Sequence, residues 1–345
     1  MPQTRSAKTV SSEPTRRVSV LAAAILFTLA AREGLMAAGA NSDGSPARFP
    51  PVGAASGKLP FEPVFHSDVE EISFSRPVGG TKVSPPVRSD ALRCWQVLPQ
   101  GLIYRSYLAG AKEPRFAGQW VKERDTGAWV WDIALGGRVG ILRYGTVGPH
   151  LPQGWQLDME GAAFPRLDLD QDRDLISCDY RFGVPLTWGY GKYQMKFAYY
   201  HLSSHLGDEY MLRNPGEFRR INYSRDVLVW GHSYYLLDDV RLYGEIGGAV
   251  YNSGGAEPWE LQFGVEYAPT TGTGFRGAPF IAIGGHLREE LDYGGNVVLQ
   301  AGWAWRGNTG GLFRVGMQYY AGFDDQYEFY DRYVDKLGFG LWYDY

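Results

Sequence analysis

The sequence has few cysteines, little net charge and no composition that would favour membrane-spanning helices. Its two cysteines, Cys94 and Cys178, are too far apart in the chain to show the spacing of a metal site. A formal net charge of −4 gives no basic surface of the kind that nucleic acid requires, so we expect no nucleic-acid partner. The mean hydropathy of −0.28 gives no support for apolar membrane helices.

Aromatic residues and glycine are abundant instead. Of the 345 residues 15% are aromatic, including 23 Tyr and 11 Trp, and 45 residues are Gly. This mixture is typical of strands, tight turns and membrane-interface belts rather than of packed helices. A chain of this length can form one large β domain or two ordinary ones.

The N-terminal region predicts export. Arg16 and Arg17 precede an apolar run over 18–31, and Ala38-Gly39-Ala40 supplies the small residues of a cleavage site. We therefore predict a signal peptide over 1–40 and, from its Pro, Gly and Ser content, a flexible linker over 41–97. A disulfide between the two cysteines could persist after export, but the sequence leaves their pairing open.

Residues 98–345 alternate between apolar and polar side chains with the period of two that β-strands require. Over 155–160, for example, the order is Trp, Gln, Leu, Asp, Met, Glu, and similar alternation recurs over 261–267, 297–305 and 313–319. The same reading makes 129–141 one continuous apolar face that includes Ile141. We expect strands almost throughout, including one over 101–110, and no helix.

Three features favour a membrane barrel over a soluble sandwich, which would also alternate. Many apolar faces end in Trp or Tyr, as an aromatic girdle does, and the polar faces carry opposite charges that suit a hydrated lumen. The last strand alternates up to Tyr345 and resembles the C-terminal signal of outer-membrane barrels. Because a sheet in lipid must close, we predict an all-β, transmembrane, antiparallel up-and-down β-barrel of about 12 strands over 98–345.

Two polar residues, His201 and Ser203, interrupt the apolar face of one strand. They share their parity with Tyr193, Met195, Phe197 and Tyr199. A spacing of two places both side chains on one face with Cα atoms about 6–7 Å apart, which lets an imidazole reach a hydroxyl. A base that removes its proton turns serine into a nucleophile. On a lipid-facing surface, we predict Ser203 as nucleophile and His201 as base acting on a lipid ester.

The loop after this strand offers further polar groups. His205 has the same parity and is an alternative base. Asp208 and Glu209 supply carboxylates of the kind that Ca²⁺ prefers, and a calcium ion there would stabilise a developing oxyanion. The simpler interpretation is that polar residues occur at strand ends near lipid headgroups without any catalytic role.

Several stretches of the barrel region also carry a resemblance to a known family. They include G-L-I-Y-R-S-Y-L-A-G-A-K-E-P-R (101–115), Y-Y-H-L-S-S-H-L-G-D-E-Y (199–210) and G-L-W-Y-D-Y (340–345). From residue 100 to 345 the sequence resembles a family of outer-membrane-type β-barrel proteins known only as a domain of unknown function. This resemblance implies the fold and no activity.

A looser resemblance concerns the two polar segments themselves. His201-Leu202-Ser203 is followed on the next strand by Arg220-Ile221-Asn222-Tyr223-Ser224-Arg225. Outer-membrane phospholipase A is similar, with His-x-Ser on one strand and Asn-x-x-Tyr-x-Arg on the next. This implies Asn222 as third catalytic member, although Arg220 stands at the aligned position and Ser204-His205 replaces the family's Asn-Gly. Lipid A deacylases combine a similar His and Ser with a Glu, which implies Glu209 or Glu217 instead.

The sequence therefore supports two classes of function. The first is an outer-membrane lipid esterase of the phospholipase A or lipid A deacylase type, whose partners are membrane lipids and the outer-membrane assembly machinery. The second is a non-enzymatic barrel that acts as a narrow pore or a structural protein, with a lumen narrowed by charges such as Arg241, Glu245 and Glu266. A homodimer is compatible with both.

Overall fold

The computed structural model describes residues 93–216 and 220–345. The predicted signal peptide, most of the predicted linker and Glu217 lie outside the described residues. The described part is nearly all β, as predicted, and has one α-helix and two 3-10 helices. The strands are β1 (Cys94–Val97), β2 (Phe116–Glu123), β3 (Trp129–Gly145), β4 (Gly154–Asp168), β5 (Asp174–Tyr190), β6 (Tyr193–Leu206), β7 (Ser224–Leu237), β8 (Val240–Ser253), β9 (Trp259–Tyr267), β10 (Ala278–Arg288), β11 (Gly294–Arg306), β12 (Leu312–Phe323) and β13 (Tyr333–Asp344). The helices are α1 (Asp208–Arg213), η1 (Glu289–Leu291) and η2 (Tyr327–Phe329).

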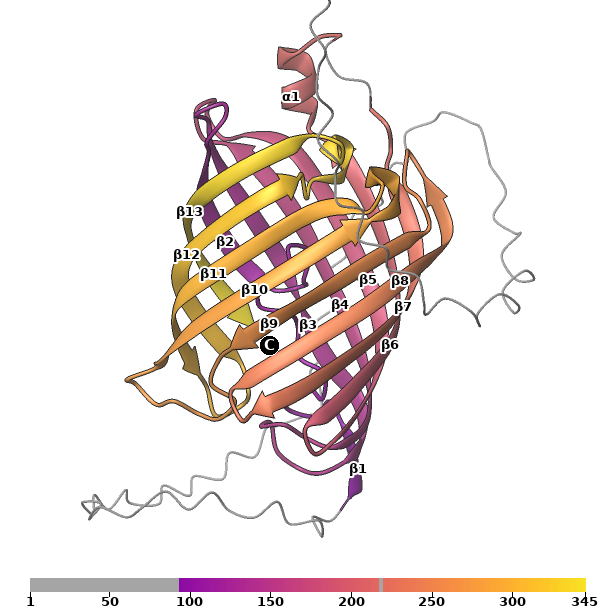
Figure 1. The fold of residues 1–345 in the computed structure, drawn as a ribbon, viewed down its shortest axis with the longest axis vertical. Helices are drawn as coiled ribbons and strands as arrows, with labels where there is room; N and C mark the ends of the chain where they lie inside the picture. The colour runs from indigo at the N-terminus through magenta and orange to yellow at the C-terminus, as the bar shows by residue number, and fades with distance from the viewer. Residues whose placement is uncertain (1–92, 217–219) are drawn as a thin grey trace, which may run out of the picture. The chain divides into compact units, whose positions relative to one another are not determined.

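The twelve strands β2 to β13 close into an antiparallel barrel (Figure 1). Neighbours in sequence are neighbours in the sheet, and β2 pairs with β13 to complete the cylinder. The short β1 pairs with the end of β3, where Cys94 lies opposite Gly145. The predicted up-and-down barrel of about 12 strands is thereby confirmed.

Within residues 93–216 and 220–345, no helix has the length and apolar character needed to cross a membrane.

The two ends of the barrel differ in their connections. We call the end that carries β1 and the connections 191–192, 268–277 and 307–311 the β1 rim. The opposite end, with α1 and the connections 207–223 and 324–332, is the α1 rim. Because the strands run antiparallel, β6 begins at the β1 rim and ends at the α1 rim.

Apolar side chains face outward and polar ones face the lumen. In β4, Trp155 and Met159 are exposed, whereas Gln156 and Asp158 are buried. In β13, Phe339 and the alternating residues around it are exposed in the same way. An outer surface of this kind is stable in hydrocarbon and not in water, so the strands span a membrane.

Residues 98–115 are not the wall strand that we predicted for 101–110. They run inside the barrel between β1 and β2, as the indigo to purple segment of Figure 1 shows, and we call them the lumen strap. Tyr104 and Tyr107 have no exposed surface. The backbone N–H groups of Tyr107 and Leu108 donate to Glu113 and Glu266 carboxylates instead of to a neighbouring strand. A buried segment of turns and bends can have the same composition as a strand, and only its hydrogen-bond partners distinguish the two.

Two smaller predictions also fail. A β-bulge between Gly140 and Leu142 shifts the parity of β3, so Leu142 and Tyr144 rather than Ile141 continue the exposed series. The six-residue α1 lies between β6 and β7, where we expected no helix. The cysteines are free, Cys94 exposed and Cys178 buried, and no disulfide joins them.

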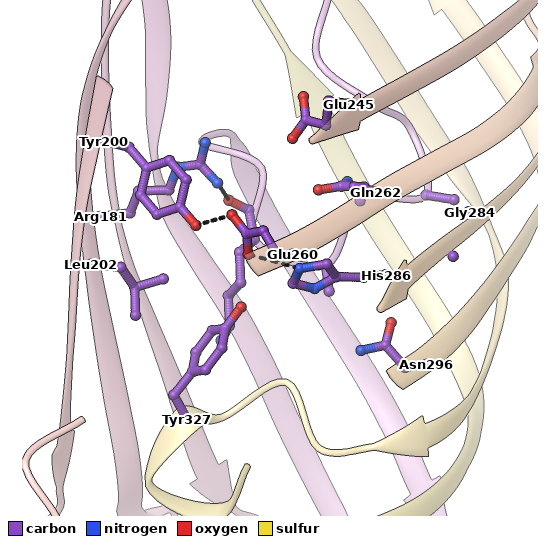
Figure 2. A pocket seen from close by; sticks show the side chains of 15 residues that line it. Arg181, Tyr200, Leu202, Glu245, Glu260, Gln262, Gly284, His286, Asn296 and Tyr327 are labelled. Carbon is purple, nitrogen blue, oxygen red and sulfur yellow. Dashed lines mark hydrogen bonds and ion pairs between the residues drawn. The ribbon is translucent and has the colours of Figure 1, made fainter. Parts of the chain in front are cut away.

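Ion pairs fill much of the lumen. In one cluster, Glu260 accepts a hydrogen bond from the Tyr200 hydroxyl and lies 2.9 Å from Nε2 of His286 (Figure 2). Glu260 also lies 3.4 Å from Nη1 of Arg225. The cavity beside these residues has a volume of about 20 Å³, enough for about one water molecule. A second cluster near the α1 rim joins Arg166 to carboxylates of Asp132, Asp324 and Asp325.

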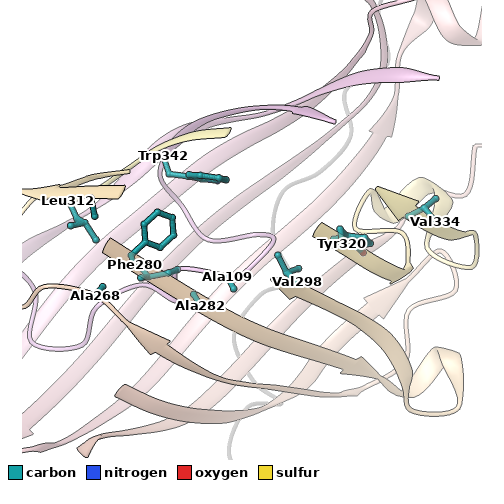
Figure 3. Close-up of a cluster of buried hydrophobic side chains, with 11 residues drawn as sticks. Ala109, Ala268, Phe280, Ala282, Val298, Leu312, Tyr320, Val334 and Trp342 are labelled. Carbon is teal, nitrogen blue, oxygen red and sulfur yellow. The ribbon is translucent and has the colours of Figure 1, made fainter. Parts of the chain in front are cut away.

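Apolar side chains fill another part of the lumen. Phe280, Trp342 and Val298 pack with Ala109 of the lumen strap (Figure 3). The strap thus fills space inside the barrel that solvent would otherwise occupy. Three cavities lie beside the strap among the described residues, and each has a volume of about 20 Å³. A channel that passes solutes would need a far larger volume.

Candidate functional site

Strand β6 directs His201 and Ser203 to the outside of the barrel, as predicted. Tyr200, Leu202 and Ser204 face inward and are buried, so the odd-numbered residues between them must face outward. Both residues lie near the C-terminal end of β6, which ends at Leu206, and they are therefore close to the α1 rim. The side chain of His201 is 42% exposed.

Asp226 of β7 lies directly opposite His201 in the sheet register. Nδ1 of His201 is 2.8 Å from Oδ1 of Asp226. The same oxygen accepts a hydrogen bond of 2.8 Å from the hydroxyl of Tyr199. These three polar side chains form one connected group on the outer face, beside Ser203.

The hydrogen bond to Asp226 fixes the orientation of the imidazole. A carboxylate at Nδ1 favours the tautomer that carries its proton there, which leaves Nε2 unprotonated and able to accept a proton. In this structure no hydrogen bond joins His201 to Ser203, which is paired across the sheet with Tyr180 and Ser224. Catalytic hydrogen bonds are often long before substrate binds.

The other residues named from the sequence lie elsewhere in the α1 rim. Asn222 has an exposed side chain and a left-handed φ of 54°, and its backbone N–H donates to Glu328. Asp208 and Glu209 form the exposed first turn of α1, and Asp208 lies 3.7 Å from Arg220. Glu217 lies outside the described residues.

His205 faces outward, and its ring centre lies 5.8 Å from that of Tyr180. Among residues 93–216 and 220–345, no three His, Cys, Asp or Glu side chains gather as a metal site would require. The calcium site at Asp208 and Glu209 stays a prediction.

Sequence reasoning missed Asp226 as the carboxylate of this group. The signal was present: Ser224 and Asp226 share the outward parity of Leu228 and Trp230, and an acid on a lipid-facing strand is as unusual as a His. The contact itself depends on the register between β6 and β7, which no sequence spacing fixes across the connection 207–223.

Residues 220–223, which precede β7, are anchored to the inner face of β6 through Glu328. Ser204 donates a short hydrogen bond to Asp179, and its oxygen accepts from the N–H of Glu328 at 3.0 Å. The Glu328 carboxylate in turn accepts hydrogen bonds from the N–H groups of Ile221 and Asn222. These contacts anchor the residues just before β7 at the α1 rim, whereas the position of Asp226 follows from the pairing of β6 with β7.

A family model described as "Protein of unknown function (DUF1207)" matches residues 79–345. No curated protein matches the sequence.

Among solved structures, outer membrane phospholipase A from Escherichia coli is 12% identical with a TM-score of 0.45, over 67% of this chain and 89% of that chain. The outer membrane phospholipase of Salmonella typhi, solved as a dimer with bound calcium, is 11% identical with a TM-score of 0.43, over 67% and 90%. A triple mutant of the Rhodopseudomonas blastica porin is 8% identical with a TM-score of 0.26, over 67% and 98%. At these identities and TM-scores, the matches assign no activity to this chain.

Proposed function

The chain belongs to the DUF1207 family, and we propose that this member is an outer-membrane esterase that hydrolyses acyl esters of membrane lipids. Ser203 is the nucleophile, His201 the general base and Asp226 the carboxylate that orients the base. The single observation that supports this proposal most is the 2.8 Å contact from Asp226 to Nδ1 of His201 on the lipid-facing surface. A carboxylate on Nδ1 leaves Nε2 for the nucleophile, which is the arrangement of Ser-His-Asp hydrolases.

The reaction follows from these three groups. Nε2 of His201 takes the proton of the Ser203 hydroxyl as its oxygen attacks the ester carbonyl carbon. The tetrahedral intermediate expels the lipid alcohol, which receives the proton from His201, and leaves an acyl group on Ser203. Water, deprotonated by His201, then releases the fatty acid. Asp226 stabilises the imidazolium ion that forms in both steps.

Ser203 and His201 must come together for the first step. They are two residues apart on one face of β6, so rotation of the two side chains is sufficient and the backbone does not have to move. Asp226 restrains the imidazole, so we expect the Ser203 hydroxyl to move toward it when an acyl ester binds.

The position of the site suits a lipid substrate. The exposed surface near it on β5 and β6 is apolar and aromatic, with Phe182 opposite His201 and Tyr180 opposite Ser203. Acyl chains of a membrane lipid fit such a surface without leaving the bilayer. If the chain enters the barrel from the periplasm, the α1 rim lies in the outer leaflet, where both phospholipid and lipid A esters are candidates.

The alternative function is a non-enzymatic barrel. The lumen strap and the ion pairs around Glu260 and Arg166 argue against a pore, because they occupy the space that a solute would use. A structural role is therefore the form of this alternative that the filled lumen favours.

The test is hydrolysis of defined lipids by the purified protein in detergent and in vesicles, with and without added calcium. Wild type should release fatty acid from phospholipid or lipid A, and Ser203→Ala should not. Equal release by both proteins would point to a contaminating hydrolase, and no release from either lipid under any condition would rule out the esterase.

A further inference from the structure

Three arginine side chains near the β1 rim have no acidic partner. Arg105, Arg143 and Arg306 donate to carbonyl oxygens of the backbone and, for Arg143, also to the side chain of Gln156. Within the described residues no Asp or Glu oxygen lies within 4.0 Å of their guanidinium groups. Other lumenal arginines are paired: Arg138 with Asp158, Arg241 with Glu266 and Arg314 with Asp344.

Arg306 and Arg105 line one cavity, together with Ser106 and Thr270. Arg306 is only 6% exposed and donates through Nε to Pro269 and through Nη1 to Gly310. Its Nη2 makes no hydrogen bond in the described part of the chain. Arg105 of the lumen strap is half-buried and uses Nη2 to bond Thr270 at 3.1 Å. Donors therefore remain on both guanidinium groups.

His150 in the connection 146–153 adds a third basic group. Burial and the positive charges of Arg105 and Arg306 lower the pKa of its imidazole, although His150 does not itself line the cavity. Its Nδ1 is buried without a hydrogen-bond partner among the described residues.

The carboxylates that line the cavity are already bonded to other groups. Asp239 accepts hydrogen bonds from Thr270, Glu266 pairs with Arg241, and Asp344 pairs with Arg314. Asp239 keeps its charge, so Arg105 and Arg306 place two guanidinium groups at a cavity with one carboxylate that lacks a cationic partner. An enclosed positive charge is unfavourable unless it is compensated, so an anion at the two arginines is electrostatically favoured.

We propose that Arg105 and Arg306 bind a phosphate-type anion at the β1 rim, close to His150, and that the anion is supplied either by free phosphate or by a lipid headgroup. Guanidinium groups match phosphate oxygens in charge and in hydrogen-bond geometry. The cavity volume of about 20 Å³ takes a single water-sized group. Only one phosphate oxygen fits inside it, so the rest of the anion lies outside the cavity.

The experiment is calorimetric titration of the full-length protein in a phosphate-free detergent. One arm uses inorganic phosphate and the other uses phosphatidic acid with short acyl chains. Arg306→Gln and Arg105→Gln should each weaken binding about tenfold or more, since each removes a charge-assisted hydrogen bond. The matched control is Arg213→Gln at the α1 rim, whose guanidinium pairs with Asp174 far from this site and should leave binding unchanged.

The outcomes separate the two sources. Binding in both arms identifies free phosphate as sufficient, and binding of phosphatidic acid alone identifies a lipid headgroup; either supports the site if the two variants weaken it. The proposal is overturned if neither ligand binds, or if Arg105→Gln and Arg306→Gln bind as wild type does. If Arg306→Gln fails to fold, the half-buried Arg105→Gln decides the matter alone.

Discussion

Ser203 and Ser204 are consecutive in β6, and their side chains lie on opposite sides of the barrel wall. Ser203 shares the outer face with His201, whereas Ser204 is buried and bonded to Asp179 and to the N–H of Glu328. The proposed nucleophile and a serine with purely structural contacts are therefore neighbours in one strand. Substituting each of them in turn compares a loss of catalysis with a loss of packing.

We expect Ser204→Ala to lower stability and to leave lipid hydrolysis per folded molecule unchanged. The substitution leaves the buried carboxylate of Asp179 and the N–H of Glu328 short of a partner, at a cost of about 1–3 kcal/mol. Urea unfolding in lipid vesicles, followed by tryptophan fluorescence, measures the loss. Ser203→Ala should do the reverse, with normal stability and no hydrolysis. Parallel effects of the two substitutions would contradict the assignment.

Asp226→Asn should lower the rate of hydrolysis by about 10⁴-fold while the protein stays folded, because an amide favours the wrong imidazole tautomer. The measurement is the rate of fatty-acid release, and the control is Asp238→Asn, an exposed carboxylate at the β1 rim. If Asn222→Ala or Glu209→Gln removes activity and Asp226→Asn does not, then a residue implied by family resemblance is the third member.

Arg166→Met should destabilise the barrel by about 3 kcal/mol, since the buried carboxylates of Asp132, Asp324 and Asp325 lose the guanidinium that they share. Lys336 and Arg332 still pair with them, which keeps the loss at the lower end for a broken buried ion pair. The midpoint of thermal unfolding, read from the heat-dependent mobility of the barrel on gels, should fall accordingly. Arg213→Met breaks a partly exposed ion pair and should cost no more than about 1 kcal/mol. Equal midpoints for the two variants would refute the structural role of the cluster.

Wild-type protein in planar lipid bilayers should show no discrete conductance steps. The lumen strap buries Tyr104 and Tyr107 inside the barrel, and the cavity beside Arg181 and Glu260 has a volume of only about 20 Å³. The comparison is a porin in the same bilayers. Reproducible steps that scale with salt concentration would show that the strap leaves the barrel and would restore the pore hypothesis.

The pKa of His150 should lie below 6.5, because burial and the charges of Arg105 and Arg306 disfavour its protonated form. The unfolded chain then binds this proton at a higher pH than the folded chain does, so stability falls as the pH drops below about 6.5. Titration of the imidazole signals by NMR, with His150→Gln for assignment, measures the value. Added phosphate should raise it, and a value at or above 6.5 without phosphate would be inconsistent with this environment.

Much of the barrel was predictable because the alternation of apolar and polar side chains along each strand shows which face is buried. The apolar Trp155 is exposed and the polar Gln156 is buried, and this difference can be predicted from the one strand alone. The lumen strap was not predictable in this way. Tyr104 and Tyr107 would suit a membrane strand equally well, and only the contacts with Glu245 and with Tyr243 across the lumen place them inside.

The same limit applies to the site. His201 and Ser203 are close in sequence, so their common face follows from the period of the strand alone. Asp226 reaches His201 from another strand, and its partner depends on a register set by the whole hairpin. Local periodicity therefore revealed two members of the group and could not reveal the third.

The lumen strap also links strands from both sides of the seam that closes the cylinder, which is the pairing of β2 with β13. On one side of the seam, Arg115 of the strap lies 3.2 Å from Asp344 of β13. On the other side, Lys112 lies 2.7 Å from Asp179 of β5. The closed barrel is therefore held by ion pairs inside the cylinder as well as by backbone hydrogen bonds along the seam.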